Sequence, residues 1–160
     1  MKIRLLLLVI IIGLNACQKK NQATNSSPTT FELLEASDSG IDFVNKVEDQ
    51  ENFNILNYRN YYNGGGVAIG DINNDGLQDV FFTANMKENK LYLNKGNFKF
   101  EDISEKAKIE GKNAWTTGVT MADVNDDGWL DIYVCYSGTD TTAHKENELF
   151  INNGNLTFTE

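Results

Sequence analysis

The chain has 160 residues, of which 41% are hydrophobic and 11% aromatic, so it suits about one globular domain and not a disordered tail. Its 23 Asp and Glu against 14 Lys and Arg give a formal net charge of −9. This balance argues against nucleic acid as a partner, because phosphate backbones repel an acidic protein.

The first residues have the layout of a secretory signal. Lys2 and Arg4 precede an apolar run that ends at Leu14 and is too short to span a bilayer, which needs about 20 residues. The following Asn15-Ala16-Cys17 completes a pattern that resembles the bacterial lipoprotein box, in which the peptide is cut before the cysteine and the sulfur is lipidated. We expect a signal peptide over residues 1–16 and lipidation at Cys17. An ordinary signal peptide with an incidental cysteine is the alternative.

The next two segments differ in composition. Residues 17–30 are polar and hold the only proline, so we expect a flexible tether. Residues 31–62 are expected to form a lead-in segment, in which Phe31–Leu34 is an outer-type strand equivalent to Phe100–Ile103. Both stretches precede a Gly-Val strand that leads into an acidic loop.

An internal repeat is the strongest pattern in the sequence. Residues 66–80 recur as residues 118–132, and residues 87–98 recur as residues 145–156. The second copy is longer by an insertion around Gly138 to Ala143, in a polar region that suits a loop. Apolar residues alternate within each copy, which is typical of strands. In the first copy they are Val67 and Ile69, Val80 and Phe82, Leu91 and Leu93, and Phe98 and Phe100.

Turn residues separate these stretches, so each copy is expected to hold four short strands. The predicted fold is all-β: two four-stranded antiparallel blades of an incomplete β-propeller, over residues 63–112 and 113–160, after the signal peptide and tether. Each blade has apolar faces on both sides, so the copies are expected to stack. Because propellers close with about four to eight blades, we expect the chain to be a truncated piece of a longer protein.

Each copy carries the pattern Asp-x-Asn-x-Asp-Gly-x-x-Asp between its first two strands. Alternate side chains place three oxygens inside a tight loop, the seventh residue adds a carbonyl, and the glycine permits a positive φ. Carboxylates this close repel one another unless a divalent cation lies between them. We predict one calcium ion in each loop. The predicted ligands are Asp71, Asn73, Asp75, the carbonyl of Leu77 and Asp79 in the first loop, and Asp123, Asn125, Asp127, the carbonyl of Trp129 and Asp131 in the second.

Other interpretations of the acidic pattern can be weighed. A pair of Asx-rich turns would need no metal, but it does not explain the aspartate at the ninth position. An EF-hand requires glutamate at loop position 12, where this chain has Phe82 and Val134, and it requires flanking helices where strands are expected. Calcium loops of the propeller type therefore remain the favoured interpretation.

The two repeated blocks resemble a known family. Each block is followed by an Asn-x-Leu-aromatic-aliphatic-Asn strand, and the whole resembles FG-GAP/VCBS repeats, the calcium-loop blades of integrin α-subunit propellers. The lead-in segment, with Ser39-Gly40-Ile41-Asp42-Phe43, resembles that of bacterial lipoproteins of the ASPIC/UnbV type, a group that is cartilage acidic protein-like. The resemblance implies a calcium-stabilised propeller used for adhesion or for binding proteins or glycans.

Residues that suggest an enzyme have simpler interpretations. His144 is the only histidine and lies in the inserted loop, with no partners for a catalytic triad visible in sequence. Cys135 lies in an alternating apolar segment, which favours a small buried side chain. Several aromatic residues could form a sugar-stacking platform, but packing between blades is the simpler role. They are Tyr58, Tyr61, Tyr62, Trp115 and Trp129.

We therefore expect a cell-envelope binding or adhesion module, not an enzyme. Its expected partner is a protein or glycan at the cell surface, and its only membrane contact is the lipid anchor. The expected location is a bacterial membrane, at the outer membrane or cell surface. The alternative is the non-catalytic N-terminal part of an exported enzyme, such as one that degrades polysaccharides.

Overall fold

A computed structural model describes residues 31–112, 114–137 and 146–160. The predicted signal peptide, the tether, Cys17 and the insertion around residues 138–143 lie outside these residues. Residues 34–160 form one compact unit. Across the described ranges, no helix is long and apolar enough to cross a bilayer.

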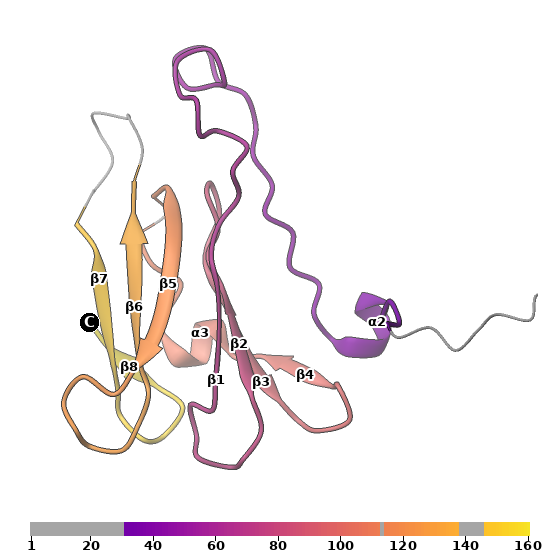
Figure 1. Cartoon of the computed structure of the whole chain (residues 1–160), viewed down its shortest axis with the longest axis vertical. Coiled ribbons are helices and arrows are strands. Elements are labelled where there is room, and N and C mark those ends of the chain that lie inside the picture. The colour runs from indigo at the N-terminus through magenta and orange to yellow at the C-terminus, as the bar shows by residue number, and fades with distance from the viewer. Residues whose placement is uncertain (1–30, 113, 138–145) are drawn as a thin grey trace, which may run out of the picture. The chain divides into compact units, whose positions relative to one another are not determined.

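Eight strands form two separate four-stranded sheets (Figure 1). Neighbouring strands are antiparallel throughout, in the orders β1-β2-β3-β4 and β5-β6-β7-β8. We call the first sheet blade 1 and the second blade 2. The predicted all-β fold with two four-stranded antiparallel sheets is therefore confirmed. The strands are β1 (Val67–Gly70), β2 (Asp79–Phe82), β3 (Lys90–Asn94), β4 (Phe100–Asp102), β5 (Thr116–Ala122), β6 (Asp131–Tyr136), β7 (Glu148–Asn152) and β8 (Phe158–Thr159).

The two blades share one hydrophobic core. It joins the buried face of blade 1 to the opposite face of blade 2, and its members include Ala68, Phe81, Leu91, Leu93, Ile132, Val134 and Phe150. Phe81 and Ile132 are completely buried. At about 25 cal/mol per Å² of buried apolar area, this shared face is the main source of stability between the blades.

The outer faces of the two blades are only partly covered within the described residues. On β1, the side chains of Val67 and Ile69 are 55% and 64% exposed, because they point away from blade 2 while Ala68 between them is buried. Tyr133 and Leu149 are exposed on the far face of blade 2. Cys135 shares that strand with Tyr133 and is a half-buried free thiol. Both sheets are thus two-sided apolar layers, as the alternation of their sequences predicts.

The blades approach most closely through their first strands, β1 and β5, which lie side by side in Figure 1. A Cβ atom added to Gly66 would lie 2.9 Å from the Cα of Gly118 and 2.9 Å from the backbone nitrogen of Val119. A Cβ atom is essentially never found this close to another heavy atom that is not bonded to it. Gly66 therefore lets one backbone rest directly on the other.

The outer-type strand expected at Phe31–Leu34 is not observed in this structure. These residues form no strand, and the side chains of Phe31 and Leu33 are 89% and 87% exposed. A strand needs a neighbour for its backbone hydrogen bonds, and among the described residues none lies beside it. The chain instead forms the short helix α2 (Ala36–Ser39), which ends at Gly40 with φ 81° and a hydrogen bond from the Gly40 N–H to the Ala36 oxygen.

Beyond α2, the lead-in segment is extended and lies on blade 1. Phe43 stacks on Phe82 with ring centroids 4.9 Å apart. Nδ2 of Asn45 donates to Oδ1 of Asn85 at 2.7 Å, and the backbone N–H of Asn85 donates to Oδ1 of Asn45 at 3.0 Å. This segment therefore covers part of the outer face of blade 1.

An aromatic cluster joins the lead-in segment to blade 2. Phe53, Tyr58 and Tyr61 surround Trp115 with ring centroids 4.8, 5.5 and 5.2 Å from it. Tyr58, Tyr61 and Trp115 are all buried. These three residues therefore have a packing role as predicted, but they pack the lead-in segment against blade 2 and not one blade against the other. Tyr62 is exposed.

The linker between the blades contains a second short helix, α3 (Ser104–Ala107), which the sequence pattern did not predict. Ile103, Ala107 and Ile109 are buried in the shared core. Oγ of Ser104 accepts the backbone N–H of Leu91 at 2.9 Å, so the linker completes the hydrogen bonding of β3. The helix thereby ties blade 1 to the start of blade 2.

Candidate metal centres

The two acidic loops connect the first two strands of each blade and lie at the same end of the sheets, the lower end in Figure 1. We call residues 71–79 loop 1 and residues 123–131 loop 2. Gly76 and Gly128 have φ values of 86° and 88°, as the pattern predicts. No other atom lies within 4 Å of a Cβ built on either glycine, so the backbone conformation alone demands glycine there.

In loop 1, the predicted ligands face the amides of their own turn. Asp71 accepts the backbone N–H of Asp75 at 3.1 Å and that of Gly76 at 2.8 Å. Oδ1 of Asn73 accepts the same Asp75 N–H at 3.2 Å, and its Nδ2 donates to Asp75 at 2.9 Å. Oδ1 of Asp75 accepts the N–H of Leu77 at 2.8 Å. The side-chain oxygens of residues 71, 73 and 75 are therefore brought together on one turn.

Loop 2 repeats this geometry. The contacts of Asp123, Asn125 and Asp127 match their loop 1 counterparts to within 0.1 Å, and Oδ1 of Asp127 accepts the N–H of Trp129 at 2.9 Å. The hydrogen bonds from the amides lower the pKa of Asp123, with the one from Gly128 the largest cause. The two loops are thus the same structure built twice.

The ninth-position aspartates are buried and close each loop. Oδ2 of Asp79 accepts the N–H of Ile72 at 3.0 Å, and Oδ1 accepts the N–H of Asn94 at 2.7 Å. Asp131 accepts the N–H groups of Val124 and Asn152 in the same way, at 3.0 and 2.8 Å. Burial raises the pKa of Asp79; hydrogen bonds from Asn94 and Ile72 oppose this, and the charges of Asp75 and Asp71 add to it. In loop 1, the carboxylate of Asp79 therefore lies near enough to those of Asp71 and Asp75 to feel their charges.

The donor set suits a hard cation. An ionised carboxylate has about four acceptor positions, so the amide contacts leave oxygen lone pairs unused. No Lys or Arg forms an ion pair with either loop in the part of the chain that the structure describes. The same residues contain no group of three or more His, Cys, Asp or Glu side chains already placed to hold a metal ion. The carboxylates of Asp71 and Asp123 instead accept hydrogen bonds from backbone amides of their own loops. An ion would have to draw them inward.

Comparison with known proteins finds a repeat family in this region. Residues 71–134, from the start of loop 1 to β6, match the family model described as an FG-GAP-like repeat. This part of the chain is similar to an FG-GAP-like repeat. Repeats of this type are typical of propeller-type binding or adhesion modules.

Three vertebrate proteins are also similar to this chain. Cartilage acidic protein 1 of Xenopus tropicalis is 35% identical over 77 residues, which is 48% of this chain and 12% of that protein. The Mus musculus and Homo sapiens proteins of the same name are 35% and 33% identical over 72 residues, or 45% of this chain and 11% of each relative. The chain thus matches only a small part of each relative's length.

The FG-GAP-like region also has contacts between its loops that sequence reasoning missed. Nδ2 of Asn74 donates to the Gly128 oxygen at 3.0 Å, and Nδ2 of Asn152 donates to the Ile72 oxygen at 2.8 Å. Asn152 and its counterpart Asn94 occupy equivalent positions in the repeat, and this recurrence was the one sign in the sequence that Asn152 has a structural role. Contacts across 54 or 80 residues leave no local pattern in a sequence.

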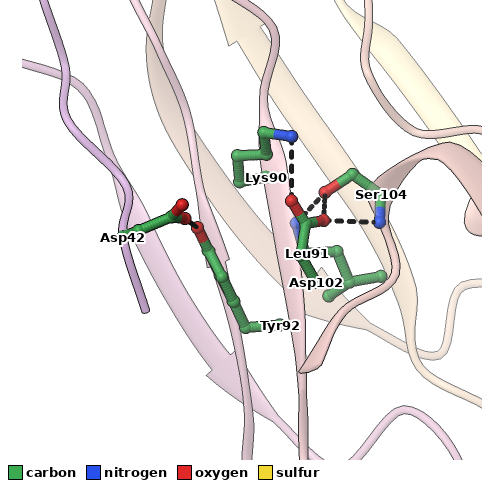
Figure 2. Close-up of polar contacts among 6 residues, drawn as sticks. All are labelled: Asp42, Lys90, Leu91, Tyr92, Asp102 and Ser104. Atoms are coloured by element: carbon green, nitrogen blue, oxygen red, sulfur yellow. Dashed lines mark hydrogen bonds and ion pairs between the residues drawn. The ribbon is translucent and has the colours of Figure 1, made fainter. Parts of the chain in front are cut away.

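A pocket of about 800 Å³ lies between the lead-in segment and blade 1, away from both loops. Figure 2 shows its polar side, where the Tyr92 hydroxyl donates to Oδ1 of Asp42 at 2.9 Å and Lys90 pairs with Asp102 at 2.8 Å. Burial and the Asp42 hydrogen bond raise the pKa of Tyr92. Phe43 and Met86 add an apolar wall. Tyr92 itself is completely buried, so the half-buried Phe43 is the aromatic surface that the pocket offers beside the Asp42 carboxylate.

Proposed function

We propose that this chain is a calcium-stabilised binding or adhesion module of the cell envelope that recognises a protein or glycan and performs no catalysis. The observation that carries the proposal is the pair of acidic loops, which repeat one geometry to within 0.1 Å and bring their carboxylates together. The FG-GAP-like repeat over residues 71–134 supports the binding role.

Each loop would hold one calcium ion through its five predicted oxygen donors. In loop 1 these belong to residues 71, 73, 75, 77 and 79, and in loop 2 to residues 123, 125, 127, 129 and 131. When bound, the ion supplies positive charge that relieves repulsion among the carboxylates. Three carboxylates, one amide oxygen and one carbonyl leave room for water in a shell of 6–8 ligands, which suits calcium better than the stricter octahedron of magnesium.

Calcium removal is expected to loosen the blades. Exported proteins with modest sites bind calcium with dissociation constants of about 10⁻⁴ M, and ten times that concentration would add about 1.4 kcal/mol per site. EDTA-treated protein should therefore take up two ions in calorimetry and melt at a higher temperature afterwards. Asp75→Ala and Asp127→Ala should each remove one equivalent.

Asp126→Asn is the matched control, because Asp126 is exposed at the fourth position of loop 2 and is not a predicted ligand. It should keep both equivalents. Uptake of no calcium by the treated wild-type chain, with an unchanged melting temperature, would refute the calcium proposal.

The proposed partner is a protein or glycan, and the pocket beside the lead-in segment suits it. The half-buried ring of Phe43 next to the Asp42 carboxylate offers stacking together with hydrogen bonds to hydroxyl or amide groups. Binding to arrays of purified glycans and extracellular proteins is expected for the wild type and should fall at least tenfold in Asp42→Ala. Equal binding by this variant would remove the pocket from the proposal.

The proposed location is a bacterial membrane surface, with lipid on Cys17. The proposal rests on the Leu14-Asn15-Ala16-Cys17 junction after the short apolar run. Metabolic labelling with a fatty acid should mark the wild-type protein and fail to mark Cys17→Ser. Equal label in the two proteins would exclude this anchor.

A further inference from the structure

Hydrogen bonds cross directly between the two acidic loops. Asn152 lies at the end of β7 in blade 2, yet its Nδ2 donates to the backbone oxygen of Ile72 in loop 1 at 2.8 Å. The same nitrogen lies 3.1 Å from the oxygen of Leu130 in loop 2. One buried amide group therefore holds both loops at once.

These contacts form a continuous chain between the two ninth-position aspartates. Asp79 accepts the N–H of Ile72, and the oxygen of Ile72 accepts Nδ2 of Asn152. The backbone N–H of Asn152 in turn donates to Asp131 at 2.8 Å. Ile72 lies between two proposed ligands in sequence, and its side chain is 1% exposed. A buried residue in a packed core has little freedom to absorb a shift of the loop on its own.

Asn94 shows what Asn152 would do without its second contact. It occupies the same place in blade 1, where Nδ2 donates to the Gln78 oxygen at 2.8 Å and the backbone N–H donates to Asp79. Oδ1 of each asparagine also accepts the N–H of a glycine two residues later, at 2.8 Å in blade 1 and 2.9 Å in blade 2. Only Asn152 reaches the loop of the other blade.

We propose that Asn152 is a positioning residue that couples the two loops, so that calcium bound in one raises the affinity of the other. The inference rests on the proposed calcium function. The carboxylates of each loop now accept their own amides, and an ion would draw their oxygens inward and shift the peptide next to Ile72. The Ile72 oxygen passes this shift to Asn152 and thus to Asp131. Both ions then favour the same arrangement of one hydrogen-bonded network.

The expected size of the coupling is set by the hydrogen bond between Nδ2 of Asn152 and the Ile72 oxygen. One buried hydrogen bond corresponds to about a fivefold change in affinity, within the usual range for coupled sites. Loop 2 should therefore bind calcium about fivefold more tightly when loop 1 is filled than when loop 1 is silenced.

Calorimetric titration of calcium into the EDTA-treated full chain measures this. Asp75→Ala silences loop 1, and the dissociation constant of loop 2 is compared with and without that change, in three backgrounds: wild type, Asn152→Ala and Asn94→Ala. Silencing should weaken loop 2 about fivefold in the wild type and in Asn94→Ala, and by a clearly smaller factor in Asn152→Ala, where the hydrogen bond from Asn74 to the Gly128 oxygen still joins the loops. A merely structural role for Asn152 would weaken loop 2 without reducing its dependence on loop 1.

A second pair of variants protects the test against misfolding. Asn152→Asp keeps the oxygen that accepts the Gly154 N–H but replaces the donor with an acceptor, and Asn94→Asp adds the same charge in blade 1. Asn152→Asp should reduce the dependence of loop 2 on loop 1, and Asn94→Asp should leave it unchanged. If the wild type binds two ions and the affinity of loop 2 does not depend on loop 1, the proposed coupling is refuted and the calcium function stands. No calcium uptake would overturn the calcium function together with the coupling.

Discussion

Replacing Asp131 by alanine is expected to lower the free energy of unfolding by about 2–6 kcal/mol. The change leaves two buried backbone N–H groups without an acceptor, and each such group costs about 1–3 kcal/mol. The Asp131 side chain is 1% exposed and accepts the N–H groups of Val124 and Asn152. Such a loss is a large part of the 5–15 kcal/mol that keeps a typical domain folded. Urea unfolding followed by circular dichroism measures it.

The Asp131→Ala measurement is made in EDTA, because the hydrogen bonds exist without a metal ion. Asp126→Asn is the control, since it removes an exposed charge from the same loop at a residue with φ 61°, a conformation that asparagine also tolerates, and it should change stability by less than about 0.5 kcal/mol. Equal unfolding midpoints for the two variants in EDTA would show that Asp131 serves only as a metal ligand.

A methyl group at Gly66 is expected to force the two blades apart. The added Cβ of Gly66→Ala would lie 2.9 Å from the Cα of Gly118 and 2.9 Å from the nitrogen of Val119, and neither is a side chain that can move aside. Overpacking of this kind costs about 1–3 kcal/mol, so the melting temperature should fall by several degrees. Differential scanning calorimetry measures the shift.

The repeat provides the control for Gly66→Ala. Gly118 is the equivalent residue of blade 2, and a Cβ there would meet only the Cβ of Cys135 at an ordinary 3.7 Å. Gly118→Ala should leave stability unchanged or raise it by about 0.4–1 kcal/mol, because alanine restricts the unfolded chain. A melting temperature that falls equally in both variants would contradict the close approach of β1 and β5.

Sequence patterns predicted the repeated parts of this molecule well. Alternating apolar residues define both sheets, and the Asp-x-Asn-x-Asp-Gly pattern places Gly76 and Gly128 at positive φ. These features depend on periods of two and on turn chemistry, which are local properties. A pattern present twice also rules out most accidental matches.

The lead-in segment shows where local reasoning fails. Phe31–Leu34 has the composition of a strand, but a strand forms only where another supplies its hydrogen bonds, and that depends on the whole fold. The cross-loop contacts of Asn74 and Asn152 were likewise invisible, because each joins residues far apart in the chain. The arrangement of ligands around an ion also cannot be predicted from local sequence patterns, because it depends on the side-chain orientations of the carboxylates.

The aromatic cluster around Trp115 affects how the molecule unfolds. In many repeat proteins each unit touches only its neighbours, so units can melt one after another from an end. Here Phe53, Tyr58 and Tyr61 reach past blade 1 and hold the first residues of blade 2. Neither the lead-in segment nor blade 2 can detach without breaking this cluster, so strands β1 to β8 should lose their amide protection against hydrogen exchange in a single cooperative event.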